Sequence, residues 1–263
     1  MKKILAWMTY CFLLATSSSF ADALAQVEDA QLGDGYTYVL VHGASGGGWD
    51  WKAMDRLLSA RGHTVYRPTL TGLGERVHLS NPDIGLDTHI ADIVNLILFE
   101  ELHGVVLVGH SYGGMVITGV MDRVPERLRH VIFLDAAVPG NGMSAEDLWG
   151  DVSANYEVVD GIIHFSWLEP GSPIPHDVPQ SLKTFTDPVS FENPAALELP
   201  ATFVAYISPG QTREGRGEDL SWRIAESRGW KMLTLQSDHN AQRSHRAELV
   251  AILESAPLGL SPR

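Results

Sequence analysis

Short apolar runs alternate along the chain with stretches of helical periodicity. Six runs read as buried strands, at residues 36–41, 64–67, 105–108, 131–134, 202–207 and 231–235. Between and after them, apolar positions three and four apart predict helices at residues 49–60, 88–101, 112–124, 220–227 and 246–255. Strands that are apolar throughout are buried on both faces. The pattern therefore predicts an α/β fold, a mostly parallel sheet covered by helices on both faces.

One segment, at about residues 139–200, breaks this alternation. It has weak periodicity and is rich in proline and in large aromatic residues, namely Trp149, Tyr156, Phe165, Trp167, Phe185 and Phe191. Exposing so many rings to water would be costly. Because the segment follows a strand end, we expect an inserted cap over the carboxyl edge of the sheet, where ligands bind in α/β folds. A meandering surface loop is the alternative.

The first residues predict a signal peptide. Two lysines precede an apolar run at residues 4–15, which is too short to span a bilayer, and small residues follow. We expect a leader at 1–23 with cleavage within 21–25, a single domain at 24–263, and a periplasmic or secreted protein. A retained membrane anchor is the alternative. Cys11, the only cysteine, would leave with the leader, so no disulfide or thiolate chemistry is expected.

The charge balance narrows the classes of partner. The 263 residues are 44% hydrophobic, which suits one well-buried domain. Asp and Glu number 32 against 19 Lys and Arg, a net charge of -13. Nucleic acids and anionic lipid surfaces both require clustered cations, so this excess argues against both as partners. It leaves the oligomeric state open.

The strongest chemical signal is Gly-His-Ser-Tyr-Gly at residues 109–113. It fits G-x-S-x-G and stands between a predicted strand and a predicted helix, the setting that this motif requires. The turn is so tight that the residues two before and two after the serine need almost no side chain. We therefore predict Ser111 as a nucleophile; a serine in an ordinary strand-to-helix turn is the alternative.

A serine nucleophile needs a base, and position sorts the eleven histidines. His239 follows the last predicted strand by a few residues. Since the carboxyl ends of parallel strands share one edge, its loop can fold back onto Ser111. The other histidines considered have weaker cases: His245 as a surface residue, His42 as one held by local backbone packing, and His78 and His89 with no specific argument.

The reaction also needs two N–H donors for the oxyanion of a tetrahedral intermediate. We expect one from the amide of Tyr112, at the helix start. The other should come from the glycine-rich loop at 42–49, with Ala44 best placed because glycines let its backbone approach a substrate. No metal or organic cofactor is needed.

Together these stretches resemble the α/β-hydrolase superfamily. The resemblance rests on residues 39–44, 49–51 and 109–115 and on the pair Asp238-His239. It is nearest to the branch of plant methyl-salicylate esterases, hydroxynitrile lyases and small bacterial carboxylesterases, and runs from about residue 36 to 253, weakening across 139–200. It implies Ser111 as nucleophile, His239 as base, and the amides of Ala44 and Tyr112 as oxyanion hole.

The chain departs from this branch at the acid of the triad. Where the branch usually carries an aspartate, after strand 202–207, this chain has Ser-Pro-Gly. Asp135, which ends the strand 131–134, is our predicted acid; capping the start of the 139–200 segment is its alternative role. The alternative acids are Glu214, Glu218 and Asp219. Asp238 is adjacent to His239, so its side chain should point away.

The predicted function is hydrolysis of an apolar carboxylic ester or lactone, with a macrolide-type lactone as one possible substrate. Dinucleotide-dependent oxidoreduction is the rival from another class, because residues 41–47 imitate a phosphate-binding loop; Trp49 stands where that loop needs a glycine. Hydroxynitrile lyase activity is disfavoured because Asn240 replaces the lysine that follows its histidine. Ser111 excludes the enzymes that use an Asp nucleophile, and a non-catalytic receptor is a further alternative.

Overall fold

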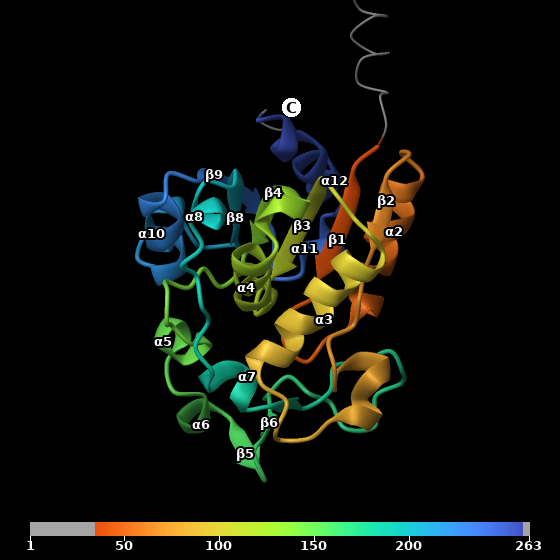
Figure 1. Ribbon diagram of the computed structural model, residues 1–263. Coiled ribbons are helices and arrows are strands. Elements are labelled where there is room, and N and C mark those ends of the chain that lie inside the picture. Colours follow the sequence, from red (N-terminus) through yellow and green to blue (C-terminus); the bar gives the residue numbers. More distant parts are fainter. Residues whose placement is uncertain (1–34, 260–263) are drawn as a thin grey trace, which may run out of the picture. The chain divides into compact units, whose positions relative to one another are not determined.

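A six-stranded parallel sheet forms the centre of the molecule (Figure 1). The computed structural model describes residues 35–259. The strands are β1 (Thr37–Val41), β2 (Thr64–Tyr66), β3 (Val105–His110), β4 (Leu128–Leu134), β8 (Ala201–Ile207) and β9 (Lys231–Gln236), in the order β2-β1-β3-β4-β8-β9. Every neighbouring pair runs parallel, so the predicted α/β fold is confirmed.

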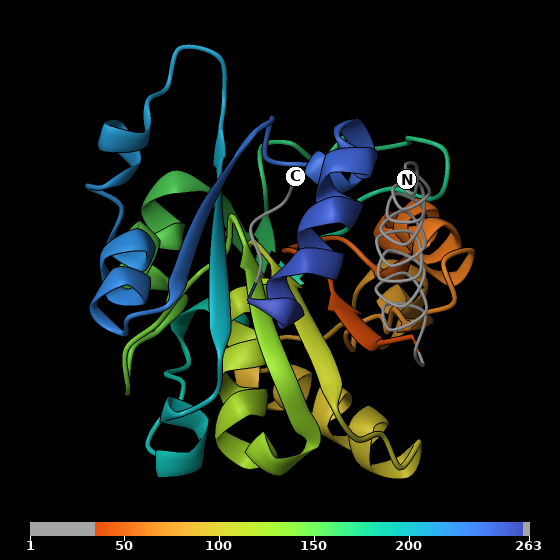
Figure 2. The same cartoon turned by 90° about the horizontal axis from the view of Figure 1, so that it is seen from above.

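Helices cover both faces of this sheet. One face carries α2 (Lys52–Ser59), α11 (Ala241–Ser244) and α12 (Arg246–Ser255), and the other carries α3 (Leu86–Phe99), α4 (Gly113–Arg123) and α10 (Leu220–Ser227). Figure 2 shows α12, in dark blue, and α4, in lime, on opposite sides of the strands. The predicted helix at 49–60 divides into a 3-10 turn, η1 (Gly48–Trp51), followed by α2.

Both faces of each central strand are buried. In β3, Val106 and Val108 pack toward α2 and α12, whereas Val105 and Leu107 pack toward α3 and α4. All four are fully buried. Successive side chains of a strand point to opposite faces. A strand covered on both sides therefore needs an unbroken apolar sequence, which is the pattern seen at 105–108.

The strand order reverses direction between β1 and β3. From β1 the chain moves outward to β2, and from β3 it moves the other way to β4. Loops that leave the carboxyl ends of β1 and β3 therefore diverge, which opens a crevice where α/β proteins bind ligands. The loop at 42–47 and Ser111 both lie at this point.

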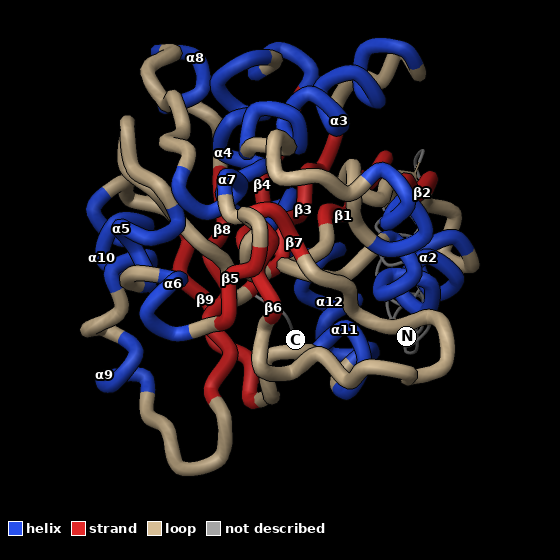
Figure 3. Tube along the Cα trace, turned by 90° about the horizontal axis from the view of Figure 1, so that it is seen from below, coloured by secondary structure: helices blue, strands red, loops and turns tan. Residues whose placement is uncertain are grey.

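The 139–200 segment contains its own small elements. They are α5 (Ala145–Trp149), α6 (Val152–Asn155), α7 (Lys183–Thr186), α8 (Pro194–Leu197) and an antiparallel sheet of β5 (Glu157–Val159), β6 (Ile162–His164) and β7 (Gln180–Ser181). In Figure 3, which looks from below, this sheet overlies the main strands, and in Figure 1 its strands β5 and β6 lie beneath them. Each helix here is shorter than two turns, and each strand has only a few residues. Such elements are too short for periodicity to reveal.

This segment lies beside the carboxyl edge of the main sheet. The N–H of Val178 donates to the carbonyl of Ser45, in the loop after β1, at 2.8 Å. Phe165, Phe185 and Phe191 are buried, as a packed segment requires. Its role as a cap over a substrate, and its boundaries, stay predictions.

Three further elements lie between the predicted strands and helices: η2 (Gly74–Leu79), η3 (Pro125–Arg127) and α9 (Arg213–Arg216). A last 3-10 turn, η4 (Ala256–Leu258), follows α12. The predicted signal peptide lies outside the described residues. Among residues 35–259, none of the helices combines the length and apolar character that crossing a membrane would take.

Gly114 should be essential to the packing of α4. A Cβ built there would lie 2.0 Å from the carbonyl oxygen of Ala137, a backbone atom that cannot swing away. We predict that Gly114→Ala lowers the free energy of unfolding by about 1–3 kcal/mol, the usual cost of overpacking, measured by urea denaturation. Gly215→Ala is the control, because its Cβ would meet nothing closer than 3.6 Å. Equal effects of the two changes would contradict this account.

Candidate active site

Ser111 is held in an uncommon backbone conformation between β3 and α4. Its φ is +53°, in the left-handed region that residues with a Cβ rarely adopt. Such a residue costs of order 1–3 kcal/mol and persists only where its surroundings fix it. Here the Ser111 N–H donates to the carbonyl of Leu134 at 3.2 Å, and its carbonyl accepts from Gly114 and Ala137 at 3.0 Å each. The turn between β3 and α4 is thus fixed from both sides.

The two glycines of the motif are required by close backbone contacts. A Cβ on Gly109 would lie 2.9 Å from the carbonyl oxygen of Gly113, and one on Gly113 would lie 2.8 Å from that of His42. A Cβ on Gly43 would in turn lie 3.1 Å from the Cβ of Ser111. The loop after β1 therefore packs directly against the serine.

Asp135 and His239 come together at the carboxyl edge of the sheet. Asp135 follows β4 and His239 follows β9, and the Nδ1 atom of His239 lies 2.6 Å from Oδ2 of Asp135. The Asp135 side chain is 9% exposed and that of His239 is 51% exposed. Because a carboxylate only accepts, Nδ1 carries the proton of a neutral ring. The Nε2 atom is then free to act as a base.

The alternative acids have other surroundings. Asp219 caps the start of α10 by accepting from the amides of Ser221 and Trp222. Asp238 accepts from the Asn240 amide and the Ser244 hydroxyl in its own loop, consistent with a side chain that points away. Within residues 35–259, no hydrogen bond joins Glu214, Glu218 or Asp219 to His239. The structure brings Asp135, and not these carboxylates, to the histidine.

Two partners keep Asp135 ionised. Burial by itself would raise the pKa of this carboxyl, but the hydrogen bond and charge of His239, followed by the charge of Arg216, outweigh it. The net pKa of Asp135 is lowered below its ordinary value. Asp135 therefore presents a negative charge behind the imidazole of His239 at neutral pH.

His110 joins the serine turn to the histidine loop, and sequence reasoning had not singled it out. It is buried, and its Nε2–H donates to the main-chain carbonyl of His239 at 2.7 Å. Burial, reinforced by the nearby His239 ring, lowers the pKa of His110 to about 4. Its place next to Ser111 in the motif is the only signal that could have marked it.

Ser111 and His239 are linked through His110, which precedes the serine and donates to the carbonyl of His239. Among the described residues, no hydrogen bond joins the Ser111 hydroxyl to the His239 imidazole. Catalytic hydrogen bonds are often long in unliganded enzymes and tighten with substrate. The arrangement therefore agrees with a nucleophile and base that meet when a substrate is bound.

The loop after β1 is fixed by groups from the 139–200 segment. Ser45 has a φ of +59°, and its N–H donates to Oε1 of Gln180 at 2.8 Å. Its hydroxyl donates to the Ala44 carbonyl at 2.6 Å and accepts from Nε1 of Trp167 at 3.0 Å. Within residues 35–259, the amides of Ala44 and Tyr112 donate no hydrogen bond. Both predicted oxyanion donors are thus unused by the protein itself.

His42 is held by the backbone, as its position had suggested. Its Nε2 accepts from the amide of Leu70 at 3.1 Å and its Nδ1–H donates to the Gly43 carbonyl at 2.8 Å. Burial lowers its pKa, so the ring stays neutral. His245, at the start of α12, has a related role. Its Nδ1 lies 3.0 Å from the hydroxyl of Ser237, which follows β9. These contacts assign structural roles to both rings.

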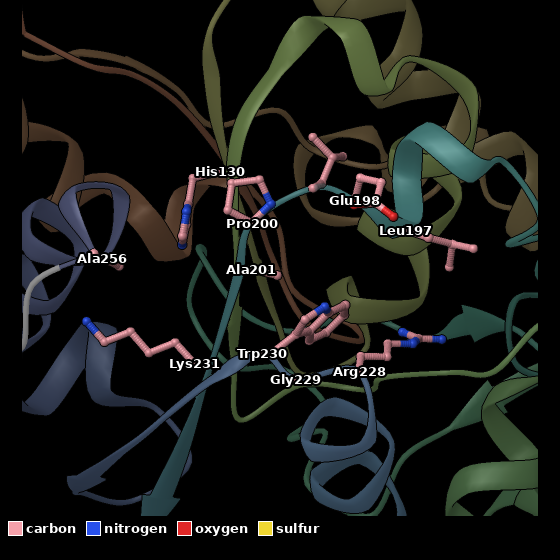
Figure 4. A pocket seen from close by; sticks show the side chains of 12 residues that line it. His130, Leu197, Glu198, Pro200, Ala201, Arg228, Gly229, Trp230, Lys231 and Ala256 are labelled. Carbon is pink, nitrogen blue, oxygen red and sulfur yellow. The ribbon is translucent and has the colours of Figure 1, made fainter.

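A cavity of about 340 Å³ lies at the opposite edge of the main sheet, where β8 and β9 begin (Figure 4). Its lining includes His130, Arg228 and Trp230. Ser111 is not among its lining residues, so this cavity does not hold the reacting groups. In the described part of the chain, no three His, Cys, Asp or Glu side chains gather as metal ligands would.

The family model of the alpha/beta hydrolase family matches residues 38–255, most of the chain. The chain belongs to the alpha/beta hydrolase family. This membership confirms the resemblance drawn from residues 39–44, 109–115 and the Asp-His pair, and it accounts for the parallel sheet with its serine turn after β3.

Relatives of this alpha/beta hydrolase include a bacterial esterase and plant methylesterases. A carbendazim hydrolyzing esterase from a Nocardioides species is 52% identical over 107 residues, which cover 41% of this chain and 44% of that protein. The salicylic acid-binding protein 2 of Nicotiana tabacum is 35% identical over 109 residues, 40% of this chain and 41% of that protein. The matched region thus spans less than half the length of these relatives.

Solved structures share the fold at low identity. An extracellular alpha/beta-hydrolase from a Paenibacillus species has a TM-score of 0.64 at 20% identity and covers 84% of this chain and 98% of its own. A pyrethroid hydrolase from Sphingobium faniae has a TM-score of 0.66 at 22% identity, covering 85% and 99%. At these identities the likeness shows the fold alone.

The hydroxyl of Tyr112, next to Ser111, is held by a buried histidine of α3. The Nε2–H of His89 donates to the carbonyl of Thr71 at 2.9 Å, so its Nδ1 accepts from the Tyr112 hydroxyl at 2.9 Å. Burial lowers the pKa of His89 to about 4. Protonating this ring would place a second proton against the Tyr112 hydroxyl in a dry interior.

We predict that the protein loses stability as the pH falls from about 6.5 toward 4, partly through His89. The unfolded chain binds a proton there in that range and the folded chain does not, so acid favours unfolding, by up to about 1.4 kcal/mol per pH unit. His89→Gln should flatten this slope in urea titrations at several pH values. The exposed His78→Gln is the control, and an unchanged slope in His89→Gln would rule out this contribution.

Proposed function

We propose that this alpha/beta hydrolase cleaves an apolar carboxylic ester through an acyl-enzyme on Ser111. The observation that carries the proposal is the hydrogen-bonded pair His239–Asp135 beside a strained serine turn, at the switch point of the sheet. A serine hydroxyl is a weak nucleophile until an adjacent base removes its proton. The three groups supply nucleophile, base and acid from three separate strands.

In this mechanism His239 takes the proton of the Ser111 hydroxyl on its Nε2 atom. The serine oxygen attacks the ester carbonyl, and the alcohol leaves with that proton. Asp135 holds the ring in the tautomer with Nδ1–H and stabilises the imidazolium that forms. Water, activated by the same histidine, then releases the acid and restores the serine.

The amides of Ala44 and Tyr112 are proposed to bind the oxyanion. Neither donates a hydrogen bond within residues 35–259, and Gly43, which precedes Ala44, packs against Ser111. The start of α4 adds its positive end at the Tyr112 side. Donors fixed in advance cost no reorganisation when charge develops, which is why they contribute strongly.

A row of packed aromatic rings supports an apolar substrate. From Tyr112 beside the serine, rings stack or tilt onto Phe185 at 5.2 Å, then Phe165 at 5.6 Å, then Trp167 at 4.3 Å between centroids. The Trp167 and Trp149 residues remain 46% and 43% exposed. Half-exposed rings of this kind favour flat or apolar groups of an ester or lactone.

Substrate and location complete the proposal. A panel of 4-nitrophenyl esters of increasing chain length, aromatic methyl esters, lactones including a macrolide, and carbendazim would identify the substrate. Carbendazim is included because the 52% identical relative is named for it. We further propose a periplasmic or secreted enzyme, on the basis of residues 1–23 and the extracellular Paenibacillus neighbour. Activity on none of the esters and lactones would contradict the function.

We predict that Ser111→Ala abolishes ester hydrolysis and labelling by a fluorophosphonate, because both need the serine oxygen. Removing the nucleophile costs about 10⁶ in turnover in subtilisin, where the comparison has been made. The thermal transition should change little. Ser45→Ala provides a nearby hydroxyl deletion that should still be labelled. Labelling of Ser111→Ala equal to that of the wild type would remove Ser111 from the mechanism.

We predict that Asp135→Asn lowers turnover by up to about 10⁴ while the protein stays folded, the loss seen for the equivalent change in a serine protease. The neutral amide cannot stabilise the imidazolium and favours the wrong tautomer. Glu214→Gln, Glu218→Gln and Asp219→Asn should each cost far less in steady-state assays. A crippling effect of one of these three together with a mild effect of Asp135→Asn would assign the acid to the loop after β8.

A further inference from the structure

Asp135 has two oxygens with separate partners. Its Oδ2 faces His239, and its Oδ1 lies 2.5 Å from Nη2 of Arg216 and accepts from the Tyr206 amide at 3.3 Å. The Arg216 side chain is 20% exposed. A carboxylate that is hydrogen-bonded at one oxygen to a guanidinium and a backbone amide cannot rotate its other oxygen away from the histidine.

From this geometry we propose that Arg216 is a positioning residue of the hydrolytic site, which orients Asp135 toward His239 and extends activity to lower pH. The proposal rests on the proposed function of the triad. Arg216 touches neither Ser111 nor the predicted oxyanion donors, so it acts through the acid alone.

The position of Arg216 in the chain supports this role. It stands in α9, in the loop that follows β8, where the resembled branch usually carries the acid. This chain takes its acid from the end of β4 and uses the β8 loop to supply a cation to that acid. Arg216 also lies 3.5 Å from Asp219, the residue that caps α10. The same Nη2 atom of Arg216 thus contacts both the acid and the residue that caps α10.

The charges around the pair set the direction of the pH effect. Besides Arg216, the ionisable groups that act on this region are His239, His110, Tyr206, Asp50, Asp219 and Asp238. Asp50 is itself paired with Arg243, whose Nε donates to its Oδ1 at 2.5 Å, so Arg216 is the permanent cation that bonds Asp135 directly. A cation repels a proton added to either member of the pair His239–Asp135. Removing it should let the pair bind a proton at a higher pH.

The test compares three variants of the full chain. Arg216→Gln removes the cation, Arg216→Lys keeps the charge without the planar fork, and Arg223→Gln removes the charge of an exposed arginine of α10 as the matched control. The readout is kcat and KM for 4-nitrophenyl acetate between pH 5 and 9. We expect Arg216→Gln to raise the midpoint of the acid limb of kcat/KM by about one pH unit, the lower end of the shifts that a nearby opposite charge causes.

The kinetic pattern separates positioning from plain structural support. At pH values below that midpoint, Arg216→Gln should lower kcat about tenfold and leave KM nearly unchanged. The reason is that one pH unit is a tenfold change in the ionised fraction. Arg216→Lys should keep the wild-type midpoint with a smaller loss of kcat. If Arg216→Gln does not fold, a midpoint in Arg216→Lys raised by a full unit would overturn the proposal. So would a midpoint in Arg216→Gln equal to those of the wild type and Arg223→Gln.

A second measurement keeps this test apart from the test of the function. The imidazole signal of His239 can be followed by NMR against pH in each variant without any substrate. If the wild type neither hydrolyses an ester nor takes the fluorophosphonate, the proposed function fails, and a raised protonation midpoint in Arg216→Gln still supports the coupling. If the wild type is active and neither midpoint moves, the role of Arg216 alone is overturned.

Discussion

At Ser111, the loop after β1 and the start of α4 approach so closely that a side chain on Gly113 would collide with backbone and one on Gly43 would press on the serine. A Cβ on Gly43, in the loop after β1, would lie 3.1 Å from the Cβ of Ser111, and one on Gly113 would lie 2.8 Å from the carbonyl oxygen of His42. This crowding holds Ser111 at a positive φ. The strand order makes it possible, because β1 and β3 lie side by side at the reversal of the sheet.

The remaining groups of the site are positioned relative to this crowded turn. Leu134, the last residue of β4, accepts from the Ser111 amide, which fixes Asp135 one residue further on. His110, at the end of β3, donates to the carbonyl of His239 and so fixes the position of the loop that carries His239. The geometry of the pair His239–Asp135 thus depends on the same backbone contacts that strain the serine.

The 139–200 segment joins the loop after β1 to the row of aromatic rings that runs from Tyr112 to Trp167. Trp167 both stacks on Phe165 and donates to the Ser45 hydroxyl, which itself donates to the carbonyl of Ala44. A substrate group that packs on Trp167 would therefore meet the same contacts that order the loop around Ala44. Under the proposed function, recognition of an apolar group and ordering of the Ala44 amide would share one set of residues.

The sequence by itself determined the parallel sheet, the serine turn and the family, because a strand buried on both faces must be apolar and a crowded turn must carry glycine. It also favoured Asp135 over the loop carboxylates, since a residue at a strand end has a known edge. Only the tertiary structure decided which partners hold Asp135, the place of His110 and the packing of the aromatic rings. The hydrogen bonds of Asp135 and His110 join residues 71 to 129 positions apart, as Arg216 with Asp135, Asp135 with Tyr206, and His110 with His239 show. No local pattern of apolar and polar residues encodes which distant side chains will meet when the loops fold back.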